Sequence, residues 1–457
     1  MRPIGTLIAL VIAVAIVSTS PVLAASQPDI TRKVLDNGLT VVVKPEPGSG
    51  LVAVVAAIRA GAAQESIQTA GLGGFVAQLL LAGTRLSSAE EVASVADEVG
   101  GNMSANWHPD FTDIRAITTS RMFNKAMDLI GECLTESNFE DKWVEQVRSD
   151  LLRRFKTDTA NVFDSAYTDM RNMLYQDNGY RRPMLGFERT IKQATIQDLR
   201  KFFAMYYVPN NIVITVVGDI TVDQALDRAD KAFAGIPTGK LPVDRGVPDE
   251  KLERSAFRAS EKDISAAYLL MGWLAPGITS GDYPAMLVAT NALGGGKGSL
   301  MFRELRQKRG MGYDVGTIYP RFRYQSHVGA YVYTDPYKTV LPQLKGGLVL
   351  DEVKSALLEQ VETLRQAPLS AKDLQRAKGY TIGTYALSQQ HLIERAFQIA
   401  MLEAVGVGSE MYRKLPDEIE KVSAEDVQRV SRKYFDKYAA VVLMPKTRSP
   451  QSGAGKN

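Results

Sequence analysis

The sequence predicts an α+β fold of two homologous domains, each an α/β sandwich with a mixed, mostly antiparallel sheet covered by helices. The first observation behind this prediction is a repeat. An amphipathic segment, Asp198–Tyr207, ends in two aromatic residues and is followed by a turn and the apolar run Ile212–Val217. The same order recurs at Asp426–Phe435 and Ala439–Met444. A repeat this far apart indicates two similar domains, because the period of a solenoid is far shorter.

The second observation is how strands and helices are grouped. Gly38–Val43 and Val52–Ile58 have the pattern of two paired strands, and Ile264–Trp273 is their counterpart in the second half. Two long helical patterns, Asp351–Arg365 and Ala371–Arg395, lie between strand clusters and do not alternate with single strands. This grouping favours α+β layers over a doubly wound sheet.

Composition divides the chain into five segments. The stretch from Gly235 to Pro248 is rich in Pro and Gly and has the composition of a linker. We predict a signal peptide at 1–25, an N-terminal domain at 26–238, a linker at 239–256, a C-terminal domain at 257–446 and a disordered tail at 447–457.

The N-terminus has the features of a secretory signal. Met1-Arg2 gives a positive start, Leu7–Val17 is apolar, and small residues precede a cleavage point after Ala24 or Ala25. An uncleaved anchor is the alternative, although the apolar run is short for a bilayer span. We therefore expect an exported protein, periplasmic or extracellular. The only cysteine is Cys133, so we expect no internal disulfide. We expect Cys133 to be a buried thiol with a structural role.

The overall charge excludes one broad class of function. The chain has 54 basic and 51 acidic side chains, which give a formal net charge of +3. Such a balance is not that of a nucleic-acid-binding protein.

Several short motifs, in their order and spacing, resemble the pitrilysin or insulinase family of inverted-zincin metallopeptidases. The resemblance covers nearly the whole mature chain and is closest to the two-domain subunits of the mitochondrial-processing-peptidase type and their bacterial relatives. The motifs are Asp36–Leu39, Gly100–Ala105, Arg182–Gly186, Tyr207–Asn211, Gly294–Gly296 and Arg309–Tyr313. The resemblance implies that the chain forms one half of a clam-like chamber.

The family's zinc motif has lost its ligands in this chain. That motif is H-x-x-E-H, with two His ligands on one helix face and a Glu as general base. Aligned here, its three positions hold Gly74, Ala77 and Gln78, and Arg154 stands where the third ligand is expected. Gly and Ala have no donor atom, and an Arg repels a cation. We therefore expect no metal bound by this chain and no catalytic residue of its own.

The second half retains the family's Arg and Tyr. Arg306 and Tyr313 match a pair that, in the family, reaches toward the substrate and the zinc site opposite. An Arg can hold a peptide carbonyl or carboxylate, and a Tyr hydroxyl can hydrogen-bond an oxyanion. The alternative is that Arg306 belongs to a solvated basic run and Tyr313 packs on a strand.

The histidines offer no better metal site. His108, His327 and His391 are far apart in sequence, and His391–Arg395 imitates the zinc motif but ends in Arg. We interpret His391 as a helix-surface residue, and the segment around His108 as a turn.

Together these patterns predict a zinc-less subunit whose partner carries an intact H-x-x-E-H motif and its Zn²⁺. This chain would contribute Arg306, Tyr313 and a peptide-binding edge at Ser104 and Ala105. Peptides or unfolded segments are the expected substrates. The alternative is a structural or peptide-binding protein of the same fold with no role in proteolysis. The sequence leaves open whether homodimers also form.

Overall fold

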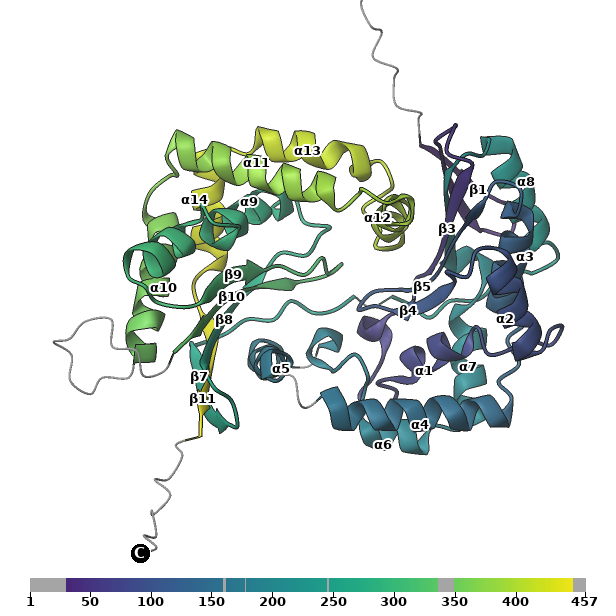
Figure 1. The fold of residues 1–457 in the computed structure, drawn as a ribbon, viewed down its shortest axis with the longest axis horizontal. Helices are drawn as coiled ribbons and strands as arrows, with labels where there is room; N and C mark the ends of the chain where they lie inside the picture. The colour runs from purple at the N-terminus through teal and green to yellow at the C-terminus, as the bar shows by residue number, and fades with distance from the viewer. Residues whose placement is uncertain (1–29, 159–161, 177, 245, 336–348, 447–457) are drawn as a thin grey trace, which may run out of the picture.

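The computed structural model describes residues 30–446 except 159–161, 177, 245 and 336–348, and it contains two sheets in two halves that face each other (Figure 1). The predicted signal peptide and tail lie outside the described residues. None of the helices in the described ranges is long and apolar enough to cross a membrane.

The first sheet has six strands in the order β1-β2-β6-β3-β5-β4. Their bounds are Thr31–Val34 for β1, Thr40–Pro45 for β2, Leu51–Ile58 for β3, Ser104–Trp107 for β4, Thr112–Thr119 for β5 and Ile212–Gly218 for β6. The prediction that β2 and β3 pair directly is wrong, because β6 lies between them, parallel to β2 and antiparallel to β3. All seven residues of β6 are buried, which suits a central strand with a neighbour on each side.

The second sheet repeats this core with five strands in the order β7-β11-β8-β10-β9. Their bounds are Ala256–Lys262 for β7, Ala267–Ala275 for β8, Asp314–Ile318 for β9, Ser326–Thr334 for β10 and Tyr438–Pro445 for β11. Here β11 is parallel to β7 and antiparallel to β8, as β6 is to β2 and β3. The strand that comes last in sequence in each half therefore lies inside its own sheet with a neighbour on each side, which confirms the predicted repeat and the α+β class.

Helices cover both sheets (Figure 1). In the first half they are α1 (Leu72–Leu79), α2 (Ala89–Glu98), α3 (Phe123–Thr135), α4 (Asp141–Asp158), α6 (Glu188–Gln193), α7 (Ile196–Tyr206) and α8 (Val222–Ala232), with short 3₁₀ turns η1 (Ala62–Gln64), η2 (Gly179–Arg181) and η3 (Pro209–Asn211). In the second half they are α9 (Tyr283–Gly294), the π-helix η4 (Phe302–Lys308), α10 (Val349–Gln366), α11 (Ala371–Leu387), α13 (Met411–Lys421) and α14 (Ala424–Tyr434). Cys133 is buried in the core of the first half, as expected, and burial raises the pKa of its thiol to about 12.

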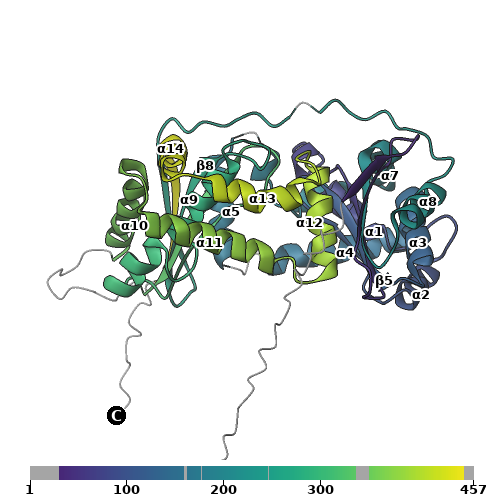
Figure 2. The same ribbon diagram turned by 90° about the horizontal axis from the view of Figure 1, so that it is seen from above.

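Two helices are exchanged between the halves. Helix α5 (Val162–Leu174) packs on β8 and β11 of the second sheet, and α12 (Leu392–Ala404) packs on β3 and β6 of the first. Figure 2 shows α12 beside the first half at the end of α11 and α13, and the chain between α8 and β7 crossing from one half to the other. The exchange overturns the prediction of one helix over 371–395, because α11 ends at Leu387 and the chain turns before α12 begins.

Polar contacts hold the exchanged helices in place. Arg395 on α12 forms an ion pair with Glu46 at 2.8 Å, and the Arg32 side chain forms another with Glu403, also at 2.8 Å. The hydroxyl groups of Tyr167 on α5 and of Tyr175, directly after α5, lie 2.7 and 2.8 Å from the two ring nitrogens of His327. The two halves are thus joined by specific side chains as well as by the linker.

Candidate functional site

Helix α1 carries the three positions where the family's zinc motif would stand. Gly74 and Gln78 are partly exposed, and Ala77 is buried at 1% exposure. The first two lie one turn apart on the same face of the helix. This face therefore has the placement of a metal-binding surface but only one side chain with a polar atom, the Gln78 amide.

A buried carboxyl group caps the start of α1. The Glu65 side chain is 6% exposed and accepts hydrogen bonds from the backbone N–H groups of Gly71, at 2.9 Å, and Gly73, at 2.8 Å. Burial raises the pKa of Glu65 to about 7, although these two hydrogen bonds and nearby Arg182 act in the opposite direction. A carboxylate here is favoured by the unpaired N–H groups of the helix end.

An indole ring occupies the space beside the first motif position. Trp107 is the last residue of β4, and a Cβ atom added to Gly73 would lie 1.9 Å from its Cη2 atom. A Cβ atom added to Gly74 would lie 3.3 Å from Cδ1 of the same ring. The close approach of α1 to β4 therefore requires glycine at position 73, and Trp107 restricts any side chain placed at position 74.

Sequence reasoning missed both Glu65 and Trp107. The glycine pair Gly73-Gly74 could have indicated that a bulky neighbour packs closely on this helix. Glycine inside a helix costs about 1 kcal/mol per residue relative to alanine, so two in a row suggest a packing reason. Nothing in the local sequence pointed to Glu65, because its partners lie six and eight residues away at a helix start.

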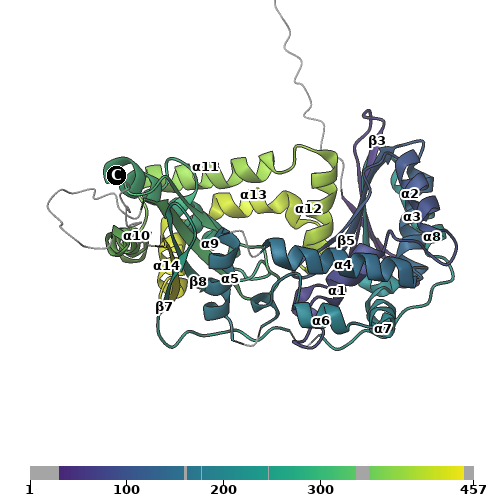
Figure 3. The same cartoon turned by 60° about the horizontal axis from the view of Figure 1, so that its bottom comes forward.

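Helix α4 packs against α1, as Figure 3 shows, and carries Arg154. The contact includes the Arg148 guanidinium, which lies 5.3 Å from the centroid of the Phe75 ring, and buried Leu151. Arg154 itself is exposed. No group of three His, Cys, Asp or Glu side chains in the described ranges is placed to hold a metal ion. The residues at the four motif positions do not fit zinc.

The histidines are engaged elsewhere. His327 is fully buried between Tyr167 and Tyr175, and burial, with a contribution from Arg171, lowers its pKa to about 3. His108 lies 2.6 Å from the Asp113 carboxylate, which also accepts from Arg115. His391 is exposed and stands at the N-terminus of α12, on the surface as predicted.

The structure places Arg306 and Tyr313 at the solvent-exposed end of η4 and in the turn that follows. The Arg306 side chain is exposed, and its Nη1 donates to the Gly312 carbonyl at 2.8 Å. Tyr313 is 49% exposed, and its ring centroid lies 5.7 Å from that of Tyr333. A π-helix is rare and often found at functional sites. Within the described residues, no hydrogen bond or ion pair joins either side chain to α1.

Ser104 and Ala105 lie on β4, the edge strand of the first sheet, which among the described residues pairs with β5 alone. Ser104 is exposed, and its hydroxyl accepts from the Asn106 side chain at 3.3 Å. The same strand carries Trp107 at its end, so the open sheet edge and the motif helix α1 are in direct contact.

Comparison with known proteins identifies the family. The model described as "Insulinase (Peptidase family M16)" matches residues 40–187, and the model described as "Peptidase M16 inactive domain" matches residues 193–380. Together they cover most of the chain, which therefore belongs to peptidase family M16, the pitrilysin or insulinase family. The match to the inactive-domain model supports a non-catalytic form of the M16 fold.

Named relatives and solved structures agree with this assignment. The uncharacterized zinc protease YmxG of Bacillus subtilis is 23% identical over 92% of this chain and 100% of that protein. An uncharacterized zinc protease of Rickettsia felis is 22% identical over 88% of this chain and 94% of that protein.

Two solved structures share the fold over nearly their full length. One is a protease from Helicobacter pylori, with TM-score 0.82 and 20% identity over 92% of this chain and 100% of its own. The other is described as a peptidase M16 inactive domain from Pseudomonas fluorescens, with TM-score 0.81 and 18% identity over 92% of this chain and 99% of its own.

Proposed function

We propose that this chain is the zinc-less subunit of a heterodimeric pitrilysin-type peptidase. The observation that carries the proposal is a contrast between two sites on one chain. The motif positions on α1 hold no zinc ligand, while Arg306 and Tyr313 remain exposed on the second half. A partner with an intact H-x-x-E-H motif supplies Zn²⁺ and the general base, and this chain supplies half of the chamber.

The two exposed side chains suit roles on a partner's substrate. Arg306 donates one N–H group to the Gly312 carbonyl and has further N–H groups that can bind a peptide carbonyl or carboxylate. The Tyr313 hydroxyl can donate to the oxyanion that forms when water attacks a peptide bond. Neither role requires a metal on this chain.

The open edge of β4 supports peptide binding. A substrate segment in extended form can add there as a further strand, with main-chain hydrogen bonds that do not depend on its sequence. Peptides and unfolded segments are therefore the proposed substrates. The signal-like N-terminus supports a proposed location of the complex in the periplasm or outside the cell.

Reconstitution tests this proposal. The candidate partner is an exported chain with an intact H-x-x-E-H motif, to be sought first in a neighbouring reading frame. Each chain is purified, and peptide cleavage and bound zinc are measured for each alone and for the mixture. We expect cleavage that depends on the mixture and zinc only in the partner. Zinc at one ion per chain together with hydrolysis by this chain alone would overturn the proposal.

One contact favours a second candidate function, a structural or peptide-holding protein without a role in proteolysis. The Arg306 guanidinium binds the Gly312 carbonyl six residues away, so it also holds its own turn together. The double variant Arg306→Ala with Tyr313→Phe separates the two candidates. A loss of turnover of about 100-fold in the reconstituted pair supports the catalytic partner, since one oxyanion donor alone contributes 10² to 10³. Unchanged turnover supports the structural candidate.

A further inference from the structure

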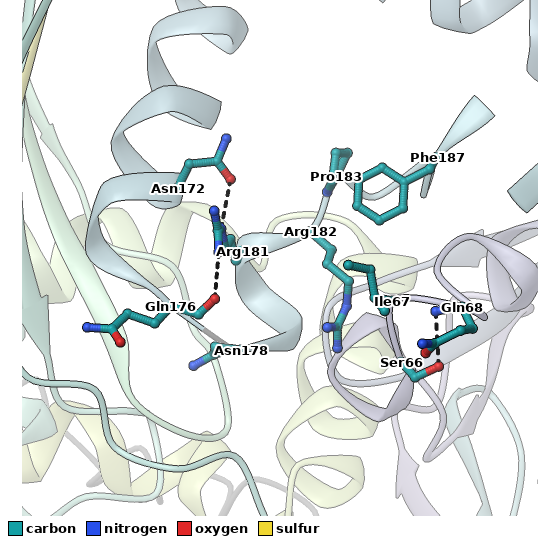
Figure 4. A pocket seen from close by; sticks show the side chains of 10 residues that line it. All are labelled: Ser66, Ile67, Gln68, Asn172, Gln176, Asn178, Arg181, Arg182, Pro183 and Phe187. Carbon is teal, nitrogen blue, oxygen red and sulfur yellow. Dashed lines mark hydrogen bonds between the residues drawn. The ribbon is translucent and has the colours of Figure 1, made fainter. Parts of the chain in front are cut away.

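A cavity of about 530 Å³ lies beside the motif helix, and neither the proposed function nor the family comparison assigns it a ligand. Three segments form it: the loop before α1, the C-terminal end of α5, and the loop that leads from η2 to α6 (Figure 4). Its described lining includes Ile67, Gln68, Asn172, Arg181, Arg182 and Phe187. A volume of this size suits one or two amino-acid residues.

The polar side of this pocket is positive. Its described lining contains two guanidinium groups and no carboxylate. Arg182 donates to the Glu65 carbonyl oxygen and lies near the Glu65 carboxylate, so the positive charge of the pocket comes mainly from Arg181. Arg181 donates from Nε to the Asn172 side-chain oxygen at 3.3 Å and from Nη1 to the Gln176 carbonyl at 2.6 Å, as Figure 4 shows. Both acceptors are neutral, so they orient the Arg181 fork without cancelling its charge. A guanidinium held in this way is suited to a carboxylate, which it can bind through two parallel hydrogen bonds.

The other side of the pocket is apolar and exposed. Ile67 is 56% exposed and Phe187 is 36% exposed, which is uncommon for large apolar side chains in the described residues. Figure 4 shows both on the side of the cavity away from Asn172 and Gln176, with Pro183 next to Phe187. An apolar group that covers these two side chains removes apolar surface from water, which is favourable.

The loop that lines the pocket also packs against the motif helix. A Cβ atom added to Gly71 would lie 2.6 Å from the Leu185 carbonyl oxygen, and one added to Gly74 would lie 3.7 Å from the Met184 carbonyl oxygen. Residues 183–187 thus form a wall of the pocket on one side and a support for α1 on the other. A ligand in the pocket lies close to the face that carries Gly74.

We infer that this pocket binds the C-terminal carboxylate of a peptide whose last residue is apolar. The Arg181 guanidinium takes the carboxylate, and Ile67 and Phe187 cover the last side chain. The Gln68 side-chain amide and the Asn172 side-chain N–H groups are available to the last peptide group, while the Asn172 oxygen accepts from Arg181. The combination of one carboxylate with an adjacent apolar group distinguishes this ligand from inorganic phosphate or an internal acidic side chain.

Calorimetric titration of the full chain with short synthetic peptides tests the inference. The first peptide ends in leucine as a free acid, the second is its C-terminal amide, and the third ends in an amide but carries an internal aspartate. We expect the free acid to bind at least about tenfold more tightly than either other peptide, because a hydrogen bond to a charged group contributes about that much.

Two variants with a matched control locate the site. Arg181→Met should abolish the difference in affinity between the free-acid and the amide peptide. Phe187→Ser should lower the affinity for both peptides and leave the ratio of the two affinities unchanged. Arg189→Met replaces an exposed Arg that does not line the pocket, so it should leave both the affinities and their ratio unchanged. Circular dichroism checks that each variant is folded.

Three results would overturn the inference: equal binding of acid and amide, an unchanged acid preference in Arg181→Met, or displacement of the peptide by inorganic phosphate at equal concentration. All measurements use this chain without a partner. Their failure therefore leaves the reconstitution test of the proposed peptidase complex untouched.

Discussion

The two regions that the resemblance to M16 peptidases predicts as site positions differ in what surrounds them. On α1 the predicted motif positions carry no metal-binding side chain, and the Trp107 ring lies against the glycine pair at the start of the helix. On η4 and the turn after it, Arg306 and Tyr313 remain exposed with polar groups available. The first site has become a packing contact between a helix and a sheet edge. The second has exposed polar groups, which the proposed role on a partner's substrate requires.

The largest expected effect concerns the packing at α1. Gly73→Ala places a Cβ atom inside the Trp107 ring and should lower the free energy of unfolding by about 3 kcal/mol, as overpacking of a tight contact does. Urea denaturation measures it. The matched control is Gly383→Ala, in the middle of α11, where a Cβ atom meets nothing within 4 Å and stability should rise by up to about 1 kcal/mol.

Adding Trp107→Ala to Gly73→Ala should recover part of the lost stability. If Gly73→Ala is as stable as the parent protein, the indole does not restrict α1 and the contrast between the two sites loses its basis.

The second effect is on zinc affinity. Gly74→His, Ala77→Glu, Gln78→His and Arg154→Glu together rebuild the family's motif, but the added side chain at position 74 must share space with Trp107. A further Trp107→Thr should raise zinc affinity by about tenfold or more, as changes around a metal site do. Zinc per chain after dialysis is measured by atomic absorption. Full zinc loading without the Trp107 change would show that the ring is no obstacle.

The third effect is a pH dependence centred on Glu65. Its pKa in the folded protein, about 7, exceeds the ordinary value of 4.5, so between these values the folded state binds a proton that the unfolded state lacks. Stability therefore falls as pH rises from about 4.5 to 7, with a slope of at most about 1.4 kcal/mol per pH unit from this group. Denaturation at several pH values should show a shallower slope in Glu65→Gln. An identical slope in the two proteins would contradict the raised pKa.

The smallest effect is expected at the second site. Arg306→Ala removes one hydrogen bond from an exposed side chain and should change the free energy of unfolding by less than about 1 kcal/mol. Gln307→Ala on the same π-helix is the control, again by urea denaturation. A loss of several kcal/mol would make Arg306 a structural clamp and favour the second candidate function.

Much of the fold could be predicted because it depends on local sequence patterns that occur in both halves of the chain. The repeated helix-turn-strand pattern at 198–217 and 426–444 identified two similar halves, and both copies end in a central strand. The break between α11 and α12 could not be predicted, since Ala371–Arg395 is helical in pattern throughout. It depends on α12 reaching the first sheet, where Arg395 meets Glu46, 349 residues away in sequence.

The sequence by itself determined which residue types stand at the predicted motif positions, and it predicted from them that the zinc ligands are missing, because ligand chemistry depends on residue type and spacing along one helix. A substrate role for Arg306 and Tyr313 stays a prediction. Only the tertiary structure decided what stands in place of the metal site, since Trp107 and Gly73 are distant in the chain and meet because β4 crosses α1. The pocket next to that helix was likewise decided by folding, because it combines three segments whose side chains have no common pattern in sequence.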